Sequence, residues 1–342
     1  MGRKRDILDR LAERLARGEL SEKTYLEIKG RYEKEGFPDE EPEPQEREFT
    51  LDIGQIIRRA VAGIPPTPPV PPVPGFHFRH GGHAGHPSVQ VSTGDYRAEE
   101  YVVTGVGAVD GNVNAKRINV VGVCKVDGDC VADDYQVTGT CKVQGNLSAK
   151  SAVCNGVLKV EGDCIAETYT NRGMSKVEGN LSASAELSNS GVLKVSGDLL
   201  GKGIANSGTC KVDGDIRSES DIVHSGVLRV GGDVHGKSFQ SSGVFDISGM
   251  LHADKISIEV SEDSRAEELE GQEIRVVARG RGLLEVESVR GKTVHLEATL
   301  AEHVEGDDVV IGPACRIEEV VAKTLRVHES SEVKEKHVGA AA

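Results

Sequence analysis

The chain of 342 residues contains no tryptophan, and phenylalanine and tyrosine occur only six times each. A globular enzyme of this length usually fills one thick core with large rings, so this composition favours a thin interior of Val, Ile, Leu, Cys and Ala. The sequence also lacks an apolar run long enough for a membrane-spanning helix. Residues 1–6 are basic and precede no apolar signal core, so we expect a cytoplasmic protein.

The chain has fewer basic than acidic residues, with 41 Lys and Arg against 55 Asp and Glu, which gives a net charge of −14. This balance disfavours nucleic acid as the main partner. The seven cysteines are an odd number and lie mostly at apolar positions, unlike a secreted disulfide framework. Cys124 and Cys141 occupy equivalent positions in adjacent repeats and are close enough for a disulfide. Leu158 and Leu193 take the same position elsewhere, which favours cysteine as a small core residue.

What the sequence does contain is one short pattern, roughly Gly-x-x-Lys-Val-x-Gly-Asp/Asn, repeated every 17 or 18 residues. The second glycines of the repeats are Gly111, Gly128, Gly145, Gly162, Gly179, Gly197, Gly214, Gly232 and Gly249. A period this short predicts a solenoid, in which each unit buries its apolar face by stacking on the next. We therefore expect an all-β parallel β-helix over 98–257, with three short sides in each coil.

Alignment on the second glycine predicts which positions face the interior. The residue two before this glycine is always Val or Ile, and the residue two after it is Val, Cys, Leu or Ile. Both columns suit buried, stacked strands. The residue four after it is Ala, Gly or Ser, which predicts a tight corner. The glycines supply either positive φ or room for the turning backbone, and the following Asp or Asn bonds backbone at the turn.

Two charged columns predict the outer surface. Five residues after the second glycine, the sign of the charge mostly alternates from coil to coil, which predicts a ladder of ion pairs. Three residues before it, a column of like charge recurs at Lys125, Lys142, Lys159, Lys176, Lys194, Lys211 and Arg229. This column is either a basic stripe that binds anionic lipid, glycan or protein, or a face compensated by neighbouring acids.

Residues 1–36 read as a helical hairpin, with Leu8, Leu11 and Leu15 on one face of its first helix. The segment Leu-Ala-Arg-Gly-Glu-Leu-Ser-Glu-Lys-Thr-Tyr at 15–25 resembles the short helical oligomerisation modules called SHOCT. That resemblance implies tethering or self-association, and the alternative is a solvated hairpin.

Residues 37–97 are expected to form an acidic, Pro- and His-rich disordered linker. Within it, 49–64 predicts a short amphipathic helix that docks on a membrane surface, on the solenoid end or on its own protein. A histidine recurs every third residue at His77, His80, His83 and His86. In a polyproline II backbone these imidazoles share one side, so the alternatives are a metal site and a solvated linker.

Residues 258–330 keep short apolar β segments without the glycine register, which predicts an irregular continuation or cap of the β-helix. We expect 331–342 to be a flexible tail. The repeated glycines give no phosphate-binding loop, and the repeat is not the nonapeptide of calcium β-rolls. No carboxylate pair or His/Ser/Cys set stands out from the repeat. We therefore expect no catalytic residues and no cofactor. An enzyme built on a β-helix is less favoured than the scaffold and the binding module described below.

The segments Val-Leu-Lys-Val-Glu-Gly-Asp at 157–163, Val-Leu-Lys-Val-Ser-Gly-Asp at 192–198 and Val-Leu-Arg-Val-Gly-Gly-Asp at 227–233 resemble the bactofilins, polymer-forming bacterial cytoskeletal proteins. The resemblance covers about 98–257. It implies a right-handed, three-sided β-helix that assembles end to end without a nucleotide, often at a membrane. The helical hairpin and the long C-terminal region depart from that family, and a C-terminal region that covers one end would limit assembly to a dimer or short oligomer.

We therefore predict a bactofilin-like scaffold that self-assembles through its coil ends and recruits partners through its N-terminal region. The alternative is a non-polymerising binding or regulatory module that presents the Lys column. The predicted assembly contacts are Tyr101, Val102 and Val103 in the first coil and Phe245, Ile247, Met250 and Leu251 in the last regular one.

Overall fold

The structure is a computed structural model, and it describes residues 89–339. The expected hairpin at 1–36 and the expected amphipathic segment at 49–64 lie outside the described residues. The four histidines of the linker, His77, His80, His83 and His86, lie outside them as well.

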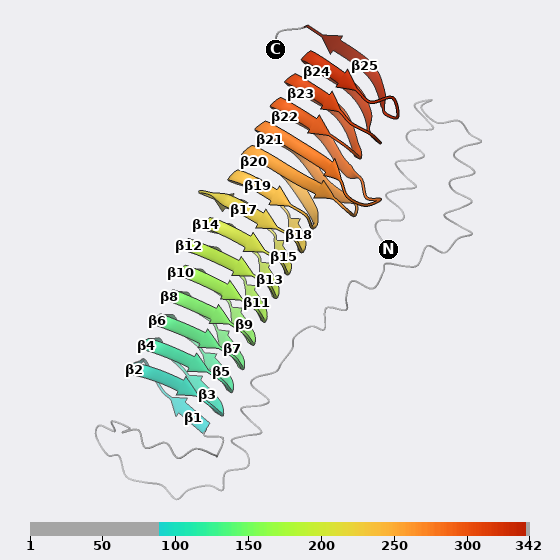
Figure 1. Ribbon diagram of the computed structural model, residues 1–342. Helices are drawn as coiled ribbons and strands as arrows, with labels where there is room; N and C mark the ends of the chain where they lie inside the picture. Colours follow the sequence, from blue (N-terminus) through green and yellow to red (C-terminus); the bar gives the residue numbers. More distant parts are fainter. Residues whose placement is uncertain (1–88, 340–342) are drawn as a thin grey trace, which may run out of the picture. The chain divides into compact units, whose positions relative to one another are not determined.

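Residues 89–338 form a parallel β-solenoid of about 15 turns, which confirms the predicted all-β class and the β-helix architecture. Figure 1 shows the strands stacked in sequence order from β1 to β25. Every strand pairs in parallel with the equivalent strand of the next coil, so each coil satisfies the backbone of its neighbours.

In the repeat region each coil has a short strand and a longer strand. The short strands are β1 (Val89–Ser92), β3 (Val106–Val109), β5 (Val123–Val126), β7 (Thr140–Val143), β9 (Val157–Val160), β11 (Met174–Val177), β13 (Val192–Val195), β15 (Thr209–Val212) and β18 (Val227–Val230). The longer strands are β2 (Tyr96–Val103), β4 (Val113–Val120), β6 (Cys130–Val137), β8 (Leu147–Cys154), β10 (Cys164–Asn171), β12 (Leu181–Asn189), β14 (Leu199–Asn206) and β19 (Val234–Ser241). One long strand is split into β16 (Ile216–Ser218) and β17 (Asp221–His224).

Each long strand turns a corner, so each coil contributes three paired segments. In β4, residues 113–115 and 117–120 pair separately with β6, and Lys116 lies at the break. The small residues predicted for the corner lie just before it. At this position a Cβ on Gly201 would lie 2.8 Å from Cγ1 of Ile204, so the residue after the corner leaves no space for a large side chain.

The two predicted interior columns are buried throughout. They comprise Val109, Val126, Val143, Val160, Val177, Val195, Val212, Val230 and Ile247 in the first and Val113, Cys130, Leu147, Cys164, Leu181, Leu199, Ile216, Val234 and Leu251 in the second. The sequence pattern missed a third side of the core, which follows the corner. It holds the largest buried side chains, including Tyr135, Tyr169 and Phe239. Among the described residues, most of the buried aromatic side chains therefore lie on one side of the interior, and Phe245 lies on another.

The repeated glycines provide room between coils, and not positive φ. Among the described residues, only Gly94 and Gly339 are glycines with positive φ, and neither belongs to the repeat. A Cβ on Gly139 would overlap the carbonyl oxygen of Gly122, and one on Gly145 would overlap Oδ1 of Asp129. Glycine is required because neighbouring turns approach each other closely.

The Asp or Asn after each second glycine forms a hydrogen-bonded ladder along the outside of the solenoid. Oδ1 of Asn112 accepts the backbone N–H of Asp129 at 2.8 Å, and Oδ1 of Asp129 accepts that of Asn146 at 2.7 Å. The ladder ends where Oδ1 of Asp233 accepts the N–H of Met250. This confirms the predicted turn role. Asp and Asn alternate over the first coils, which places carboxylates two coils apart and reduces their repulsion.

A second ladder is buried in the core. Nδ2 of Asn171 donates to Oδ1 of Asn189 at 2.7 Å, and Nδ2 of Asn189 donates to Oδ1 of Asn206 at 2.7 Å. Nδ2 of Asn206 lies 3.1 Å from Nδ1 of His224, whose Nε2 lies 2.9 Å from the carbonyl oxygen of Val244. The pattern makes Nδ1 the acceptor and Nε2 the donor. The side chains of Asn189, Asn206 and His224 are thus paired along one direction of the stack, whereas Oδ1 of Asn171, at the start of the ladder, is buried without a partner among the described residues.

The structure differs from the expected boundaries at both ends. Residues 89–97, which were expected in the linker, already belong to the solenoid, because β1 pairs with β3 and β2 pairs with β4. The C-terminal region continues as ordered coils in β20 (Val244–Val260), β21 (Ser264–Ala278), β22 (Leu284–Leu296), β23 (Thr299–Ile311), β24 (Arg316–Val327) and β25 (Glu332–Val338). The expected flexible tail contains β25, which pairs with β24. In this region the number of residues in a coil varies. Ser264 pairs with Leu284 in the next coil, and Leu284 pairs with Thr299 in the coil after that.

Candidate functional site

The residues predicted as assembly contacts lie in two different environments. Phe245, Ile247 and Leu251 are buried in β20, and the strands β21 to β25 stack beyond them. Met250 is in the same strand. These residues are therefore internal to the solenoid, because the chain continues to coil where a terminal coil was expected. Charge at Phe245 would disrupt the core and would not report on an end.

The N-terminal end begins with β1, which has no charged residue, and with β2. Among residues 89–339, each of these strands pairs on one side only, β1 with β3 and β2 with β4. Val102 belongs to β2, and the side chains of Tyr101 and Val103 are buried. The rings of Tyr96 and Tyr101 pack with centroids 4.8 Å apart. Val91 of β1 is 58% exposed. This end combines an unpaired backbone edge with an uncharged β1. The charged residues of β2, Arg97, Glu99 and Glu100, lie at exposed outer positions, and Val91 is in register with the outer Lys column.

The C-terminal end is built differently. Its last strand, β25, has the sequence Glu-Val-Lys-Glu-Lys-His-Val and pairs only with β24 among the described residues. Lys336 is in register with Val320, a fully buried core position in β24. A charged residue therefore ends a core column of the stack. Charges on an edge strand, above all at inward positions, oppose the addition of another strand.

The Lys column is a compensated outer face. Nζ of Lys142 lies 2.9 Å from Glu161, and Nζ of Lys159 lies 3.2 Å from Glu161 and 3.3 Å from Glu178. Lys125 and Lys176 pair with acids of the same coils. The predicted alternating ladder also forms pairs, between Lys150 and Asp133 and between Lys116 and Glu99. These contacts satisfy the basic column within the solenoid, so it offers little free charge to an anionic partner.

The seven cysteines are free and buried, including Cys124 and Cys141, which lie opposite each other in β5 and β7. Burial raises the pKa of the Cys164 and Cys210 thiols to about 12. These thiols stay protonated at neutral pH and act as small apolar residues. The interpretation of cysteine as a core residue is confirmed.

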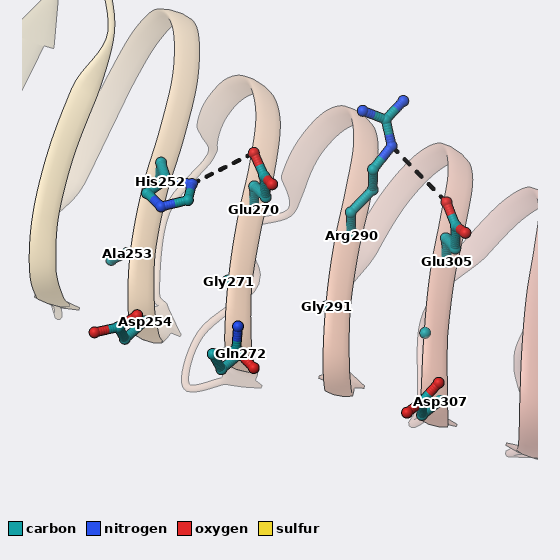
Figure 2. A pocket seen from close by; sticks show the side chains of 11 residues that line it. His252, Ala253, Asp254, Glu270, Gly271, Gln272, Arg290, Gly291, Glu305 and Asp307 are labelled. Carbon is teal, nitrogen blue, oxygen red and sulfur yellow. Dashed lines mark ion pairs between the residues drawn. The ribbon is translucent and has the colours of Figure 1, made fainter. Parts of the chain in front are cut away.

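A shallow groove crosses the C-terminal coils at their corner. Figure 2 shows His252, Glu270, Arg290 and Glu305 in a row along one rim, and Asp254, Gln272 and Asp307 along the other. His252 pairs with Glu270 at 3.3 Å, and Arg290 lies 3.9 Å from Glu305. Carboxylates dominate the rim, so the groove attracts cations and accepts hydrogen bonds.

The groove exists because the small-residue corner continues as Gly271, Gly291 and Gly306. A Cβ on Gly306 would lie 2.7 Å from the carbonyl oxygen of Gly291 and 2.9 Å from Cγ2 of Val309. The packing of the coils thus leaves a line of glycines as its floor. The sequence analysis missed this groove, although three glycines before apolar β segments were the available signal.

Next to the groove, histidine and glutamate alternate over β23, β24 and β25. Nδ1 of His303 lies 3.0 Å from Oε2 of Glu319, and Nε2 of His337 lies 3.4 Å from Oε1 of the same glutamate. This group was also missed from the sequence. A signal was present, because His303, Glu319 and Glu335 recur at intervals of 16 residues, the local coil length.

In the described part of the chain, no helix has the length and apolar character needed to cross a membrane. Searches of protein-family models, curated proteins and solved structures found no match to this chain.

Proposed function

We propose that this protein is a bactofilin-like cytoskeletal scaffold, which associates end to end through the N-terminal end of its solenoid without a nucleotide. The observation that carries the proposal is the difference between the two ends. At the N-terminal edge β1 is uncharged and β2 has charges only at exposed outer positions, which favours docking of a second solenoid, whereas β25 has Lys336 in a core column, which opposes it. We also propose that the solenoid is right-handed, as the resemblance to the bactofilins implies.

If the solenoids associate through one end alone, the assembly stops at two chains. Two solenoids that meet with their N-terminal ends form a twofold pair, and the charged β25 strands then lie at its outer ends. Val89, the first described residue of each solenoid, would then lie near the centre of the pair. That arrangement suits a cytoplasmic scaffold that recruits partners through residues 1–88, with contact of 49–64 to a membrane surface as a further prediction.

Analytical ultracentrifugation of the full chain tests this proposal. We expect a dimer at micromolar concentration and a monomer for Val91→Lys, because the new charge would lie on the docking edge. Val131→Lys is the matched control, since Val131 is 43% exposed on β6, in the middle of the solenoid. A wild-type monomer, or equal loss of association in both variants, would contradict the proposal.

The same samples test the alternative of a binding module that uses the Lys column. Vesicles that contain anionic lipid should bind wild type and Lys142→Met equally, because Lys142 is already paired with Glu161. Weaker binding of the variant, in a chain that stays monomeric, would favour the binding module.

A further inference from the structure

The last three strands bring two imidazoles and two carboxylates to one outer face of the solenoid. His303 of β23, Glu319 of β24 and Glu335 of β25 are in register with one another. His337 lies two residues after Glu335, and side chains two residues apart on a strand share a face. One ligand atom each of Glu319, Glu335 and His337 lies within 4.8 Å of the other two.

The spacing of these atoms suits metal ligands. Nε2 of His337 lies 3.4 Å from Oε1 of Glu319 and 3.8 Å from Oε2 of Glu335. Ligands about 2.1 Å from a tetrahedral zinc ion lie about 3.4 Å from one another. The nitrogen thus faces both carboxylates at a separation longer than a normal hydrogen bond, with space for an ion among the three groups.

His303 holds Glu319 in position. Its Nδ1 lies 3.0 Å from Oε2 of Glu319, the carboxylate oxygen that does not face His337. This hydrogen bond directs Oε1 toward the other two groups. Metal-binding carboxylates are commonly oriented by such hydrogen bonds from neighbouring residues.

The local charge also favours a cation. Within residues 89–339, three basic residues of these coils pair with other acids: Lys323 with Asp307 at 2.7 Å, Arg316 with Glu332 at 3.7 Å, and Lys334 with Glu318. Glu319 and Glu335 together contribute two negative charges beside His337 when both are ionised.

We propose that Glu319, Glu335 and His337 bind a divalent transition metal ion of the zinc class, and that His303 is the positioning residue of this site. One imidazole nitrogen and two carboxylate oxygens form a mixed ligand set that suits zinc, and water completes the coordination. The ion would link β25 to β24 and so fasten the capping strand to the solenoid. The proposal does not depend on the end-to-end association proposed above.

Zinc titration by calorimetry tests the proposal. All variants carry His77, His80, His83 and His86 replaced by serine, so that the linker histidines do not contribute. In this background we expect one zinc ion per chain, at least tenfold weaker binding for His337→Gln and for Glu335→Gln, and about tenfold weaker binding for His303→Gln. His252→Gln is the matched control, because His252 also pairs with a glutamate on the next coil but belongs to no group of three ligands among residues 89–339.

Hydrogen exchange provides a second readout. Zinc should slow exchange of the β25 amides in the background protein and leave them unchanged in His337→Gln. Circular dichroism would verify that each variant keeps its β structure. Undiminished zinc binding by a folded His337→Gln protein, or an equal loss of binding in His252→Gln, would overturn the proposal.

Discussion

Residues 89–257 and residues 264–338 form the same parallel stack with two different kinds of repeat. In the first region the coils have nearly equal length, and their turns are glycines that make room for one another. In the second the coil length varies, and two turn residues, Ala298 and Ala314, have positive φ values of 47° and 62°. A stack of equal coils with similar core columns can slip by one coil at little cost, whereas coils of unequal length cannot.

The buried polar ladder lies within the region of equal coils, where the same column holds Val120, Val137 and Cys154 in the coils before it. Asn171, Asn189, Asn206 and His224 occur only in the region of equal coils. At the equivalent column, the C-terminal coils have Val276, Leu296 and Ile311, all buried. We infer that the ladder specifies register, because a slip by one coil would place an amide opposite an apolar residue and leave it without a partner.

The largest effect is expected from Asn189→Ala, which breaks the ladder at its centre. Loss of this side chain leaves polar groups of Asn171 and Asn206 buried with fewer partners, so the free energy of unfolding should fall by about 3 kcal/mol. Urea unfolding followed by circular dichroism measures this change. The control is Ser184→Ala, at an exposed position of the same strand. Equal stability of the two variants would show that the ladder does not stabilise the repeat region.

A somewhat smaller loss is expected from Gly139→Ala. The added methyl group would overlap the carbonyl oxygen of Gly122, and relief requires neighbouring turns to move apart, at a cost of about 2 kcal/mol. Gly203→Ala is the control, because a Cβ there meets no atom within 4 Å. The same urea experiment distinguishes the two, and a similar effect of both would contradict the close-approach explanation.

The turns of the C-terminal region should respond in the opposite direction. Ala314 is exposed and has a φ of 62°, which costs an L-residue about 1 kcal/mol. Ala314→Gly should therefore raise the unfolding free energy by up to about 1 kcal/mol, in contrast to the loss from Gly139→Ala. Thermal unfolding of both variants would test this reversal, and a lower melting temperature for Ala314→Gly would refute it.

The smallest effect on stability is expected from a change of pH, and it comes from His224 in the repeat region. Burial lowers the pKa of His224 below its ordinary value of 6.5. The unfolded chain therefore binds this proton at a higher pH than the folded chain, so the stabilisation is complete above about pH 6.5 and is lost as pH falls toward the folded pKa. The urea concentration at the midpoint of unfolding should fall between pH 7.5 and pH 5.5, and the fall should be larger for the wild type than for His224→Asn. Identical drops would exclude His224 as a source of the acid sensitivity.

Periodicity predicted the repeat region well because its signal is a strict spacing. The glycines, the Val column and the Asp/Asn ladder all follow from alignment on one residue. The ladder of Asn171, Asn189 and Asn206 recurs at the same spacing, yet the search for apolar columns passed over it because amides are usually exposed. The C-terminal coils lack a fixed spacing, so an irregular continuation or cap of the β-helix was expected there, but the residues that pair from coil to coil could not be predicted.

The candidate sites were less predictable than the fold. Phe245 and Leu251 were expected at an end because the glycine register stops near them, but stacking depends on strand pairing and continues through β25. The cap depends on Lys336 falling in register with Val320. That juxtaposition arises from a coil length of 16 residues, which only the three-dimensional pairing reveals.

The central claim is that one end of the solenoid associates while the other is capped by charge. Negative-stain electron microscopy of the full chain beside Lys336→Val tests it most directly, since valine would restore the core column at the C-terminal edge. We predict paired solenoids for the wild type and longer end-to-end chains for the variant. Single solenoids for both proteins, or filaments of the wild type, would contradict the account.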